Sequence, residues 1–331
     1  MRLHLLFCLS VLSSSPLCAA GEAPSIERLS PAFDQSIAPG TGVETLATGF
    51  DWSEGPVWDA NQECLLFSDV PRNTIYRWPA KGEAATDATG VSVFMHPSGF
   101  TGVSGYGGEP GSNGLAIDAE GRLLCCEHGD RRVSVLTKGG GKQTLADAFD
   151  GKRFNSPNDL AIHSNGDVYF TDPPYGLPGK EKDASRELPF CGVFRATPGG
   201  VVTLLTSELA RPNGVALSRD ERTLYVAQSD PARPVIMAYP LKDDGTLGDG
   251  RVFFDAKPLL ATGKGLPDGL KVHGSGQVFS TGPGGVLVIA PDGTLLGRIL
   301  TGRPTANVAF GGEHLYITAD DLLLRVKLAT R

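Results

Sequence analysis

The sequence predicts an all-β fold, namely a six-bladed β-propeller whose four-stranded blades surround a central channel. Three observations predict it. One short sequence pattern recurs six times, a polar residue opens each copy, and glycine and proline are abundant, with 43 and 24 among 331 residues. Together with a hydrophobic content of 40 %, this abundance of turn residues favours many short strands over helices.

Each copy of the pattern has the form of a β-hairpin. It opens with Asn, Asp or Glu, continues with apolar residues in alternation, passes through a polar turn, and ends in an apolar run. The copies begin at residues 54, 113, 158, 213, 268 and 307. Intervals of roughly 40 to 60 residues suit four-stranded propeller blades with loop insertions.

Segments outside the six copies supply the remaining strands. We expect outer strands in apolar runs such as Val201–Leu205 and Val252–Phe254, and a strand near Val43–Phe50 that closes the ring of blades. A β-sandwich is the alternative all-β fold, but it gives no reason for a polar residue at the same point of six evenly spaced copies.

The first twenty residues have the composition of a secretory signal peptide. Arg2 is followed by the apolar run Leu5–Leu12 and by small residues at Ala19 and Ala20. We therefore expect an exported protein, periplasmic or extracellular, with residues 1–20 removed and residues 21–331 folded as one domain. Loss of Arg2 makes the net charge of −7 one unit more negative. No basic patch stands out, so we expect no nucleic-acid partner, no membrane partner after cleavage, and a monomer.

Four cysteines remain after this segment, at positions 64, 125, 126 and 191. An exported chain can form disulfides, but their pairing does not follow from sequence. Buried free thiols are the alternative. Cys125 and Cys126 are adjacent on a predicted strand, so their side chains should face opposite ways.

In a propeller the innermost strand of each blade starts at the channel, so the first residue of each copy should face the axis. All six of these residues carry a side-chain oxygen and none is His or Cys: Glu54, Asn113, Asn158, Asn213, Asp268 and Asn307. Hard divalent cations select carboxylate and amide oxygens, whereas zinc favours His and Cys. For any single copy, an Asn that caps the strand entry is an alternative explanation.

Four of the six copies contain motifs that together resemble those of the gluconolactonase family. This family includes regucalcin (senescence marker protein) and is related to diisopropyl fluorophosphatase. The motifs occur in order and lie between residue 45 and the end of the chain: Glu54-Gly-Pro-Val-Trp58, Ser156-Pro-Asn-Asp159, Arg211-Pro-Asn-Gly214 and Pro267-Asp-Gly269. The resemblance implies a six-bladed propeller that holds a divalent ion in its channel and hydrolyses lactones or related esters.

Carried over by motif, the metal ligands would be Glu54, Asn158, Asn213 and Asp268. The ion would most simply be Ca²⁺, with Mg²⁺, Mn²⁺ and Zn²⁺ as alternatives. The remaining two channel residues, Asn113 and Asn307, are interpreted as substrate contacts at the rim. The stretch Asp172-Pro-Pro-Tyr175-Gly176 is similar to bacterial lactonases.

The expected reaction is hydrolysis of a small sugar lactone by water activated at the ion. Because Ca²⁺ acidifies water weakly, a carboxylate base is needed, and Asp268 is the first choice, with Asp172 and Asp159 as alternatives. Asp159 and Asp172 are also interpreted as substrate contacts. His128, at the end of an inner hairpin, and Tyr175 complete the predicted substrate-binding set. The alternative functions are hydrolysis of another ester or a phosphotriester at the same ion, and a non-catalytic propeller that binds a sugar or a protein around a structural metal.

Overall fold

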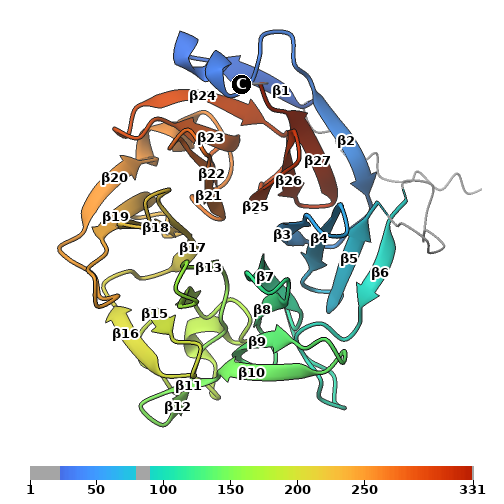
Figure 1. Ribbon diagram of the computed structural model, residues 1–331, viewed down its shortest axis with the longest axis vertical. Helices are drawn as coiled ribbons and strands as arrows, with labels where there is room; N and C mark the ends of the chain where they lie inside the picture. Colours follow the sequence, from blue (N-terminus) through green and yellow to red (C-terminus); the bar gives the residue numbers. More distant parts are fainter. Residues whose placement is uncertain (1–22, 80–89, 330–331) are drawn as a thin grey trace, which may run out of the picture.

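The computed structural model describes residues 23–79 and 90–329, and these residues form a ring of six antiparallel sheets around a central channel (Figure 1). Each blade has four strands that run in sequence order outward from the channel in blades 1 to 5. The part of the chain described contains no α-helix. The predicted six-bladed propeller is therefore confirmed, and the predicted signal peptide lies outside the described residues.

The six blades are built as follows, each from its innermost to its outermost strand. They comprise β3 (Ser53–Asp59), β4 (Cys64–Asp69), β5 (Thr74–Trp78) and β6 (Ser92–Met95); β7 (Ser112–Ile117), β8 (Leu123–Glu127), β9 (Arg132–Leu136) and β10 (Lys142–Ala146); β13 (Leu160–Ile162), β14 (Val168–Asp172), β15 (Gly192–Ala196) and β16 (Val202–Thr206); β17 (Pro212–Leu217), β18 (Thr223–Gln228), β19 (Val235–Pro240) and β20 (Arg251–Asp255); β21 (Leu270–Val272), β22 (Val278–Gly282), β23 (Gly285–Ile289) and β24 (Leu295–Leu300); and β25 (Asn307–Gly311), β26 (His314–Ala319), β27 (Leu322–Lys327) and β2 (Val43–Thr48).

Smaller elements decorate the ring. Strand β1 (Ser25–Arg28) extends the fifth blade beyond β24, and a two-stranded ribbon lies between the second and third blades. The ribbon is β11 (Ala148–Phe149) and β12 (Lys152–Arg153), and the three 3₁₀ helices are η1 (Pro31–Gln35), η2 (Lys180–Lys182) and η3 (Lys257–Ala261).

The ring is closed by strands from the two ends of the described chain. Strand β2 pairs antiparallel with β27 and becomes the outermost strand of the sixth blade. The predicted closing strand near Val43–Phe50 is thus confirmed. The innermost strands of the six blades leave only short edges that face the channel, and a closed ring limits edge-to-edge association in this way.

Apolar side chains fill the spaces between neighbouring blades rather than one central core. Between the second and third blades, Cys126 of β8 packs with Phe170 and Phe194 of the next blade, and Phe154 completes an aromatic cluster there. Cys125 faces the other way, toward Leu66 of the first blade, as predicted. All four described cysteines are buried. No helix in the described ranges is long and apolar enough to span a membrane.

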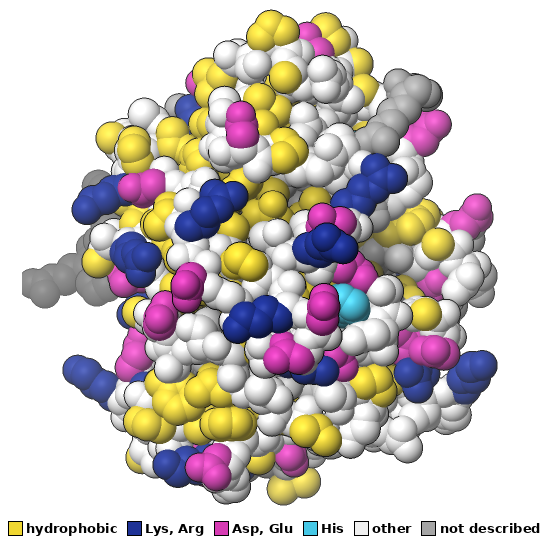
Figure 2. Space-filling view, turned by 60° about the vertical axis from the view of Figure 1, so that its left-hand side comes forward, with side chains coloured by type: hydrophobic (Ala, Val, Ile, Leu, Met, Phe, Trp, Pro, Cys, Tyr) yellow, Lys and Arg dark blue, Asp and Glu magenta, His cyan; other side chains and the backbone are white. Residues whose placement is uncertain are grey.

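The outer surface carries charges of both signs. Figure 2 shows one side of the molecule, on which Lys and Arg side chains alternate with Asp and Glu side chains over the blade edges. Several of them form ion pairs along a blade, such as Arg325 with Glu44 and Arg122 with Asp118. Exposed pairs of this kind contribute little to stability individually, so the fold depends on the apolar packing between blades.

Candidate active site

A cavity of about 420 Å³ occupies one end of the central channel. Side chains from all six blades or their connecting loops line it: Trp52, Glu54, Glu109, Asn113, Asn158, Tyr175, Arg211, Asn213, Ser229, Gly265, Leu266, Asp268, Pro304 and Thr305. The four predicted metal ligands are therefore brought together in one cavity, and two of the predicted substrate contacts, Asn113 and Tyr175, line it as well.

Irregular strand pairing turns these side chains toward the axis. The register of β3 against β4 shifts between Glu54 and Val57, and β17 shifts against β18 between Pro212 and Val215, around Asn213. Strand β7 shifts in the same way around Asn113. A bulge adds a residue to one strand and re-aims its side chain, so it is a common feature beside binding sites.

The two carboxylates at the axis are poorly compensated by the protein itself. Glu54 is buried, and its Oε2 accepts a hydrogen bond from Gly55 N at 2.9 Å. Burial is the main cause that raises the pKa of Glu54 to about 8, and the negative charge of Asp159 adds to it. Burial, followed by the charges of Glu54 and Asp159, also raises the pKa of Asp268. Asp268 Oδ1 and Asn113 Oδ1 are buried atoms without a hydrogen-bond partner among the described residues.

This donor set fits a hard divalent cation. Two carboxylates supply the charge, and the carboxamides of Asn113, Asn158 and Asn213 supply neutral oxygens. No group of three or more His, Cys, Asp or Glu side chains that could hold a metal converges anywhere in the described ranges. The buried oxygens without partners are nevertheless what a cation would satisfy, because an unpaired buried acceptor is costly.

Several polar residues of the cavity were missed in the sequence, among them Glu109, Arg211 and Ser229. Glu109 lies in the long connection between β6 and β7, outside the repeated pattern, and its side chain is 37 % exposed. Arg211 is held at the rim by Glu181, with Nη2 of Arg211 2.8 Å from Oε1 of Glu181. Ser229 accepts a hydrogen bond from Asn213 Nδ2 and donates one to the carbonyl of Pro267, which ties the fourth blade to the fifth. Only Arg211 had a sequence signal, since it opens the Arg211-Pro-Asn motif.

His128 and Asp172 lie next to the cavity without lining it. The His128 ring is fully buried, and its Nδ1 lies 3.8 Å from Oε2 of Glu109. Asp172 accepts hydrogen bonds from the backbone N–H groups of Asn155 at 2.7 Å and Ser156 at 2.8 Å. Its carboxylate thus holds the segment that leads into Asn158. Burial raises the pKa of Asp172 to about 7, although these two hydrogen bonds oppose the shift.

Asn307 occupies a different register position from the one predicted. The N–H of Gly114 donates to the carbonyl of Asn158, and the N–H of Gly269 donates in the same way to Ala306. Asn158 N and Ala306 N also donate to equivalent carbonyls of their own second strands. Ala306 is therefore the first residue of the sixth copy. Asn307 is the second residue of that copy and corresponds to Asp159 in the third copy. We call the first residues of the six copies, which surround the channel axis, the first-residue ring. The prediction that Asn307 belongs to this ring was wrong by one residue, because the last copy is shortened.

Asp159 and Asn307 form a channel floor beneath the first-residue ring. Asn307 Nδ2 donates to Asp159 Oδ2 at 3.4 Å, and Lys271 Nζ lies 3.3 Å from the same oxygen. Both floor residues are buried. Glycines make room for them: a Cβ on Gly114 would lie 2.8 Å from Asp159 Oδ1, and one on Gly269 would lie 2.0 Å from the Asn307 side chain. Neither floor residue is among the side chains that line the cavity.

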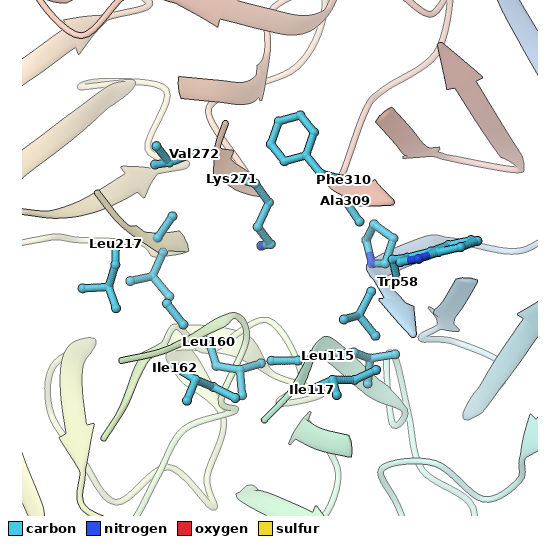
Figure 3. A pocket seen from close by; sticks show the side chains of 16 residues that line it. Trp58, Leu115, Ile117, Leu160, Ile162, Leu217, Lys271, Val272, Ala309 and Phe310 are labelled. Atoms are coloured by element: carbon cyan, nitrogen blue, oxygen red, sulfur yellow. The ribbon is translucent and has the colours of Figure 1, made fainter. Parts of the chain in front are cut away.

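A second cavity, of about 380 Å³, lies beyond the floor (Figure 3). Its wall is formed by the third to fifth residues of the copies and is apolar apart from Lys271, as at Leu115, Ile162 and Phe310. Lys271 points toward the channel axis in this view. The channel therefore has a polar end and an apolar end, separated by one acidic and one amide side chain.

The neutral, buried state of His128 should make stability depend on pH. Burial lowers the pKa of His128 to about 4, from an ordinary value of 6.5. In the unfolded chain His128 binds a proton near pH 6.5, whereas in the folded chain it stays neutral until the pH approaches 4. The free energy of unfolding therefore keeps its full value above pH 6.5 and falls as the pH drops from 6.5 toward 4. The full loss is about 3 kcal/mol. We expect urea unfolding of His128→Leu between pH 7.5 and 4.5 to show a shallower decline than the wild type, and parallel declines would contradict the assignment.

Comparison with known proteins adds independent information. Residues 52–320 match the family model described as the SMP-30/gluconolactonase/LRE-like region. A gluconolactonase of Zymomonas mobilis is 40 % identical over 317 residues, which cover 92 % of this chain and 86 % of that protein. A pentonolactonase of Haloferax volcanii is 26 % identical over 285 residues, covering 84 % of each chain.

Solved structures agree with these sequence matches. A gluconolactonase structure from Xanthomonas campestris has a TM-score of 0.78 at 31 % identity and covers 94 % of this chain and 99 % of its own. Regucalcin of Agrobacterium tumefaciens, described as a calcium-binding protein, has a TM-score of 0.66 at 18 % identity and covers 88 % of this chain and 96 % of its own. The second likeness shows a shared fold alone.

Proposed function

The chain belongs to the SMP-30/gluconolactonase/LRE-like family, and from this premise we propose that it is a lactonase that opens small sugar lactones with the help of a divalent cation in the polar end of its channel. The observation that carries the proposal is the convergence of Glu54, Asp268 and three carboxamides on one cavity, where buried oxygens lack partners. The names of the relatives supply the substrate class, and the cavity supplies the chemistry.

Glu54, Asn158, Asn213 and Asp268 would hold the cation, with Asn113 close enough in the ring to share in binding it or to contact the substrate. Ca²⁺ suits this set of oxygen donors better than zinc does. When bound, the cation supplies Lewis-acid polarisation of the lactone carbonyl and stabilises the negative charge that develops on its oxygen.

Asp268 is the residue we assign as the general base. Glu54 already accepts a hydrogen bond through Oε2, whereas Asp268 Oδ1 has no partner among the described residues. In the reaction, Asp268 accepts a proton as a water oxygen bonds to the carbonyl carbon. It returns the proton to the ring oxygen as the acyl C–O bond breaks, so the product is the open hydroxy acid.

The remaining lining residues are suited to bind a polyhydroxylated ring. Tyr175, Ser229 and Glu109 offer a phenol, a hydroxyl and a third carboxylate to sugar hydroxyls. Arg211 is already neutralised by Glu181, so it adds little net charge at the rim. We therefore assign substrate orientation to Asn113, Tyr175 and Glu109. Export to the periplasm or beyond is part of the proposal and is supported by the composition of residues 1–20.

The test is acid release from glucono-δ-lactone by purified protein, corrected for spontaneous opening of the lactone. The protein is stripped with a chelator and then resupplied with Ca²⁺, Mg²⁺, Mn²⁺ or Zn²⁺ in separate reactions. We expect turnover to fall at least tenfold on stripping and to return with one of these ions, and Glu54→Gln to need a higher ion concentration. Full activity of the stripped protein would contradict the proposed role of the cation. Absence of activity with every ion, in protein shown to be folded, would contradict the proposed lactonase function.

A further inference from the structure

The channel floor carries the only charged side chains that the repeats place on the axis below the first-residue ring, within the described ranges. At the second position of the repeats, four copies have glycine, one has Asp159 and one has Asn307. At the fourth position, five copies have Val or Ala and one has Lys271. The two charged residues among these exceptions form an ion pair, in which Lys271 Nζ lies 3.3 Å from Asp159 Oδ2.

The two members of this ion pair differ in their environments. The Asp159 side chain is 1 % exposed, and its Oδ1 accepts the backbone N–H of Leu160 at 2.9 Å while its Oδ2 faces Asn307 and Lys271. The Lys271 side chain is 25 % exposed and reaches the floor from the apolar cavity on the other side (Figure 3). The carboxylate is therefore fixed, whereas the ammonium can leave the pair and remain hydrated.

Asp159 acts on the polar cavity through its charge. It directly follows the ring residue Asn158 in the chain. Its Oδ1 also lies 2.8 Å from the position that a Cβ on Gly114, the residue after Asn113, would take. A negative charge at this depth attracts a cation in the ring, and the ammonium beneath it weakens that attraction, since few water molecules screen charges inside the channel.

We propose that the Lys271–Asp159 pair in the channel floor sets the affinity of the polar cavity for its divalent cation, with Asp159 strengthening binding and Lys271 limiting it from the apolar side of the channel. The inference rests on the proposed cation site. Neither residue lines the cavity, so both are positioning residues that act on the cation through their charges and not by direct contact. A purely structural ion pair would behave differently, because loss of either partner would then disturb the site in the same direction.

The test is isothermal calorimetry of Ca²⁺ binding to the chelator-stripped wild type and to variants of the floor pair prepared in the same way. We expect Asp159→Asn to weaken binding about tenfold, Lys271→Met to strengthen it about tenfold, and the double variant to return within about threefold of the wild type. Lys271→Arg keeps the charge and should bind like the wild type, and Lys271→Gln replaces Lys271→Met if that variant folds poorly. Circular dichroism and urea unfolding confirm that each variant is folded before titration.

The outcomes separate this inference from the proposed function. Shifts in the same direction for both single variants, or shifts below twofold for both, would overturn the role of the floor while the cation site stands. Wild-type protein that hydrolyses the lactone but binds no Ca²⁺, Mg²⁺ or Mn²⁺ would overturn the inference and leave a cation-independent lactonase. Opposite shifts that cancel in the double variant would establish the floor as the element that sets the affinity.

Discussion

Asp268→Asn should lower kcat for glucono-δ-lactone by about a thousandfold while the protein stays folded. Asn has nearly the shape of Asp and keeps one oxygen for a cation, but it cannot accept a proton at neutral pH. Asp268 Oδ1 is buried without a hydrogen-bond partner among the described residues, and Asn keeps a second side-chain position that can still carry an accepting oxygen. The expected loss therefore falls on the chemical step and leaves stability within about 1 kcal/mol of the wild type.

Two measurements decide between the roles of Asp268 as base and as ligand. Calorimetry should show at most about a tenfold loss of cation affinity, and kcat should stay low when the cation is raised to saturation. Recovery of kcat at high cation concentration would show that Asp268 is only a ligand. Glu109, a cavity carboxylate that lies outside the repeated pattern, would then be assigned as the general base. Asp292→Asn, in an exposed turn far along the fifth blade, is the matched control and should leave kcat unchanged.

The fold and the centre of the site were predictable because both are local features of the repeat. Period-two alternation across a short turn specifies each hairpin, and the first residue of each hairpin necessarily reaches the channel. The repeat pointed to six residues, and the family motifs selected four of them, Glu54, Asn158, Asn213 and Asp268, which do line one cavity. Their chemistry as a cation site is a proposal that the family resemblance and the unpartnered oxygens support.

Two features could not be read from the pattern. Glu109 enters the cavity from a connection between blades, where no periodicity constrains the chain, so nothing in the sequence distinguishes it from an exposed loop acid. Asn307 was assigned one position too early, because the last copy lacks the usual residue after its Asn. The match of Val308-Ala309-Phe310 with Leu160-Ala161-Ile162 gives the correct register, and a one-residue slip in a strand moves each side chain to the other face.

Asp172→Ala should reduce stability by about 3 kcal/mol and also weaken cation binding. The Asp172 carboxylate accepts the backbone N–H groups of Asn155 and Ser156, and both donors are buried. Each buried donor that loses its acceptor costs about 1–3 kcal/mol. The segment that these bonds fix leads directly to Asn158, whose oxygen belongs to the ring at the axis. Loosening the segment should therefore move a ligand that Asp172 never touches.

The matched control is Asp59→Ala, at the turn that follows β3. Its carboxylate accepts hydrogen bonds from the backbone N–H groups of Asn61 at 2.9 Å and Gln62 at 3.1 Å, as Asp172 does from Asn155 and Ser156. Asn61 and Gln62 are exposed, so water replaces part of the lost bonding and the cost in stability is smaller. The turn lies at the end of the strand opposite Glu54. Urea unfolding and Ca²⁺ calorimetry on both variants separate the two effects. We expect both to be destabilised and only Asp172→Ala to lose cation affinity. Equal affinities would mean that Asn158 is held by its own backbone bonds, through Thr171 and Gly114, and that Asp172 supports the third blade without acting on the site.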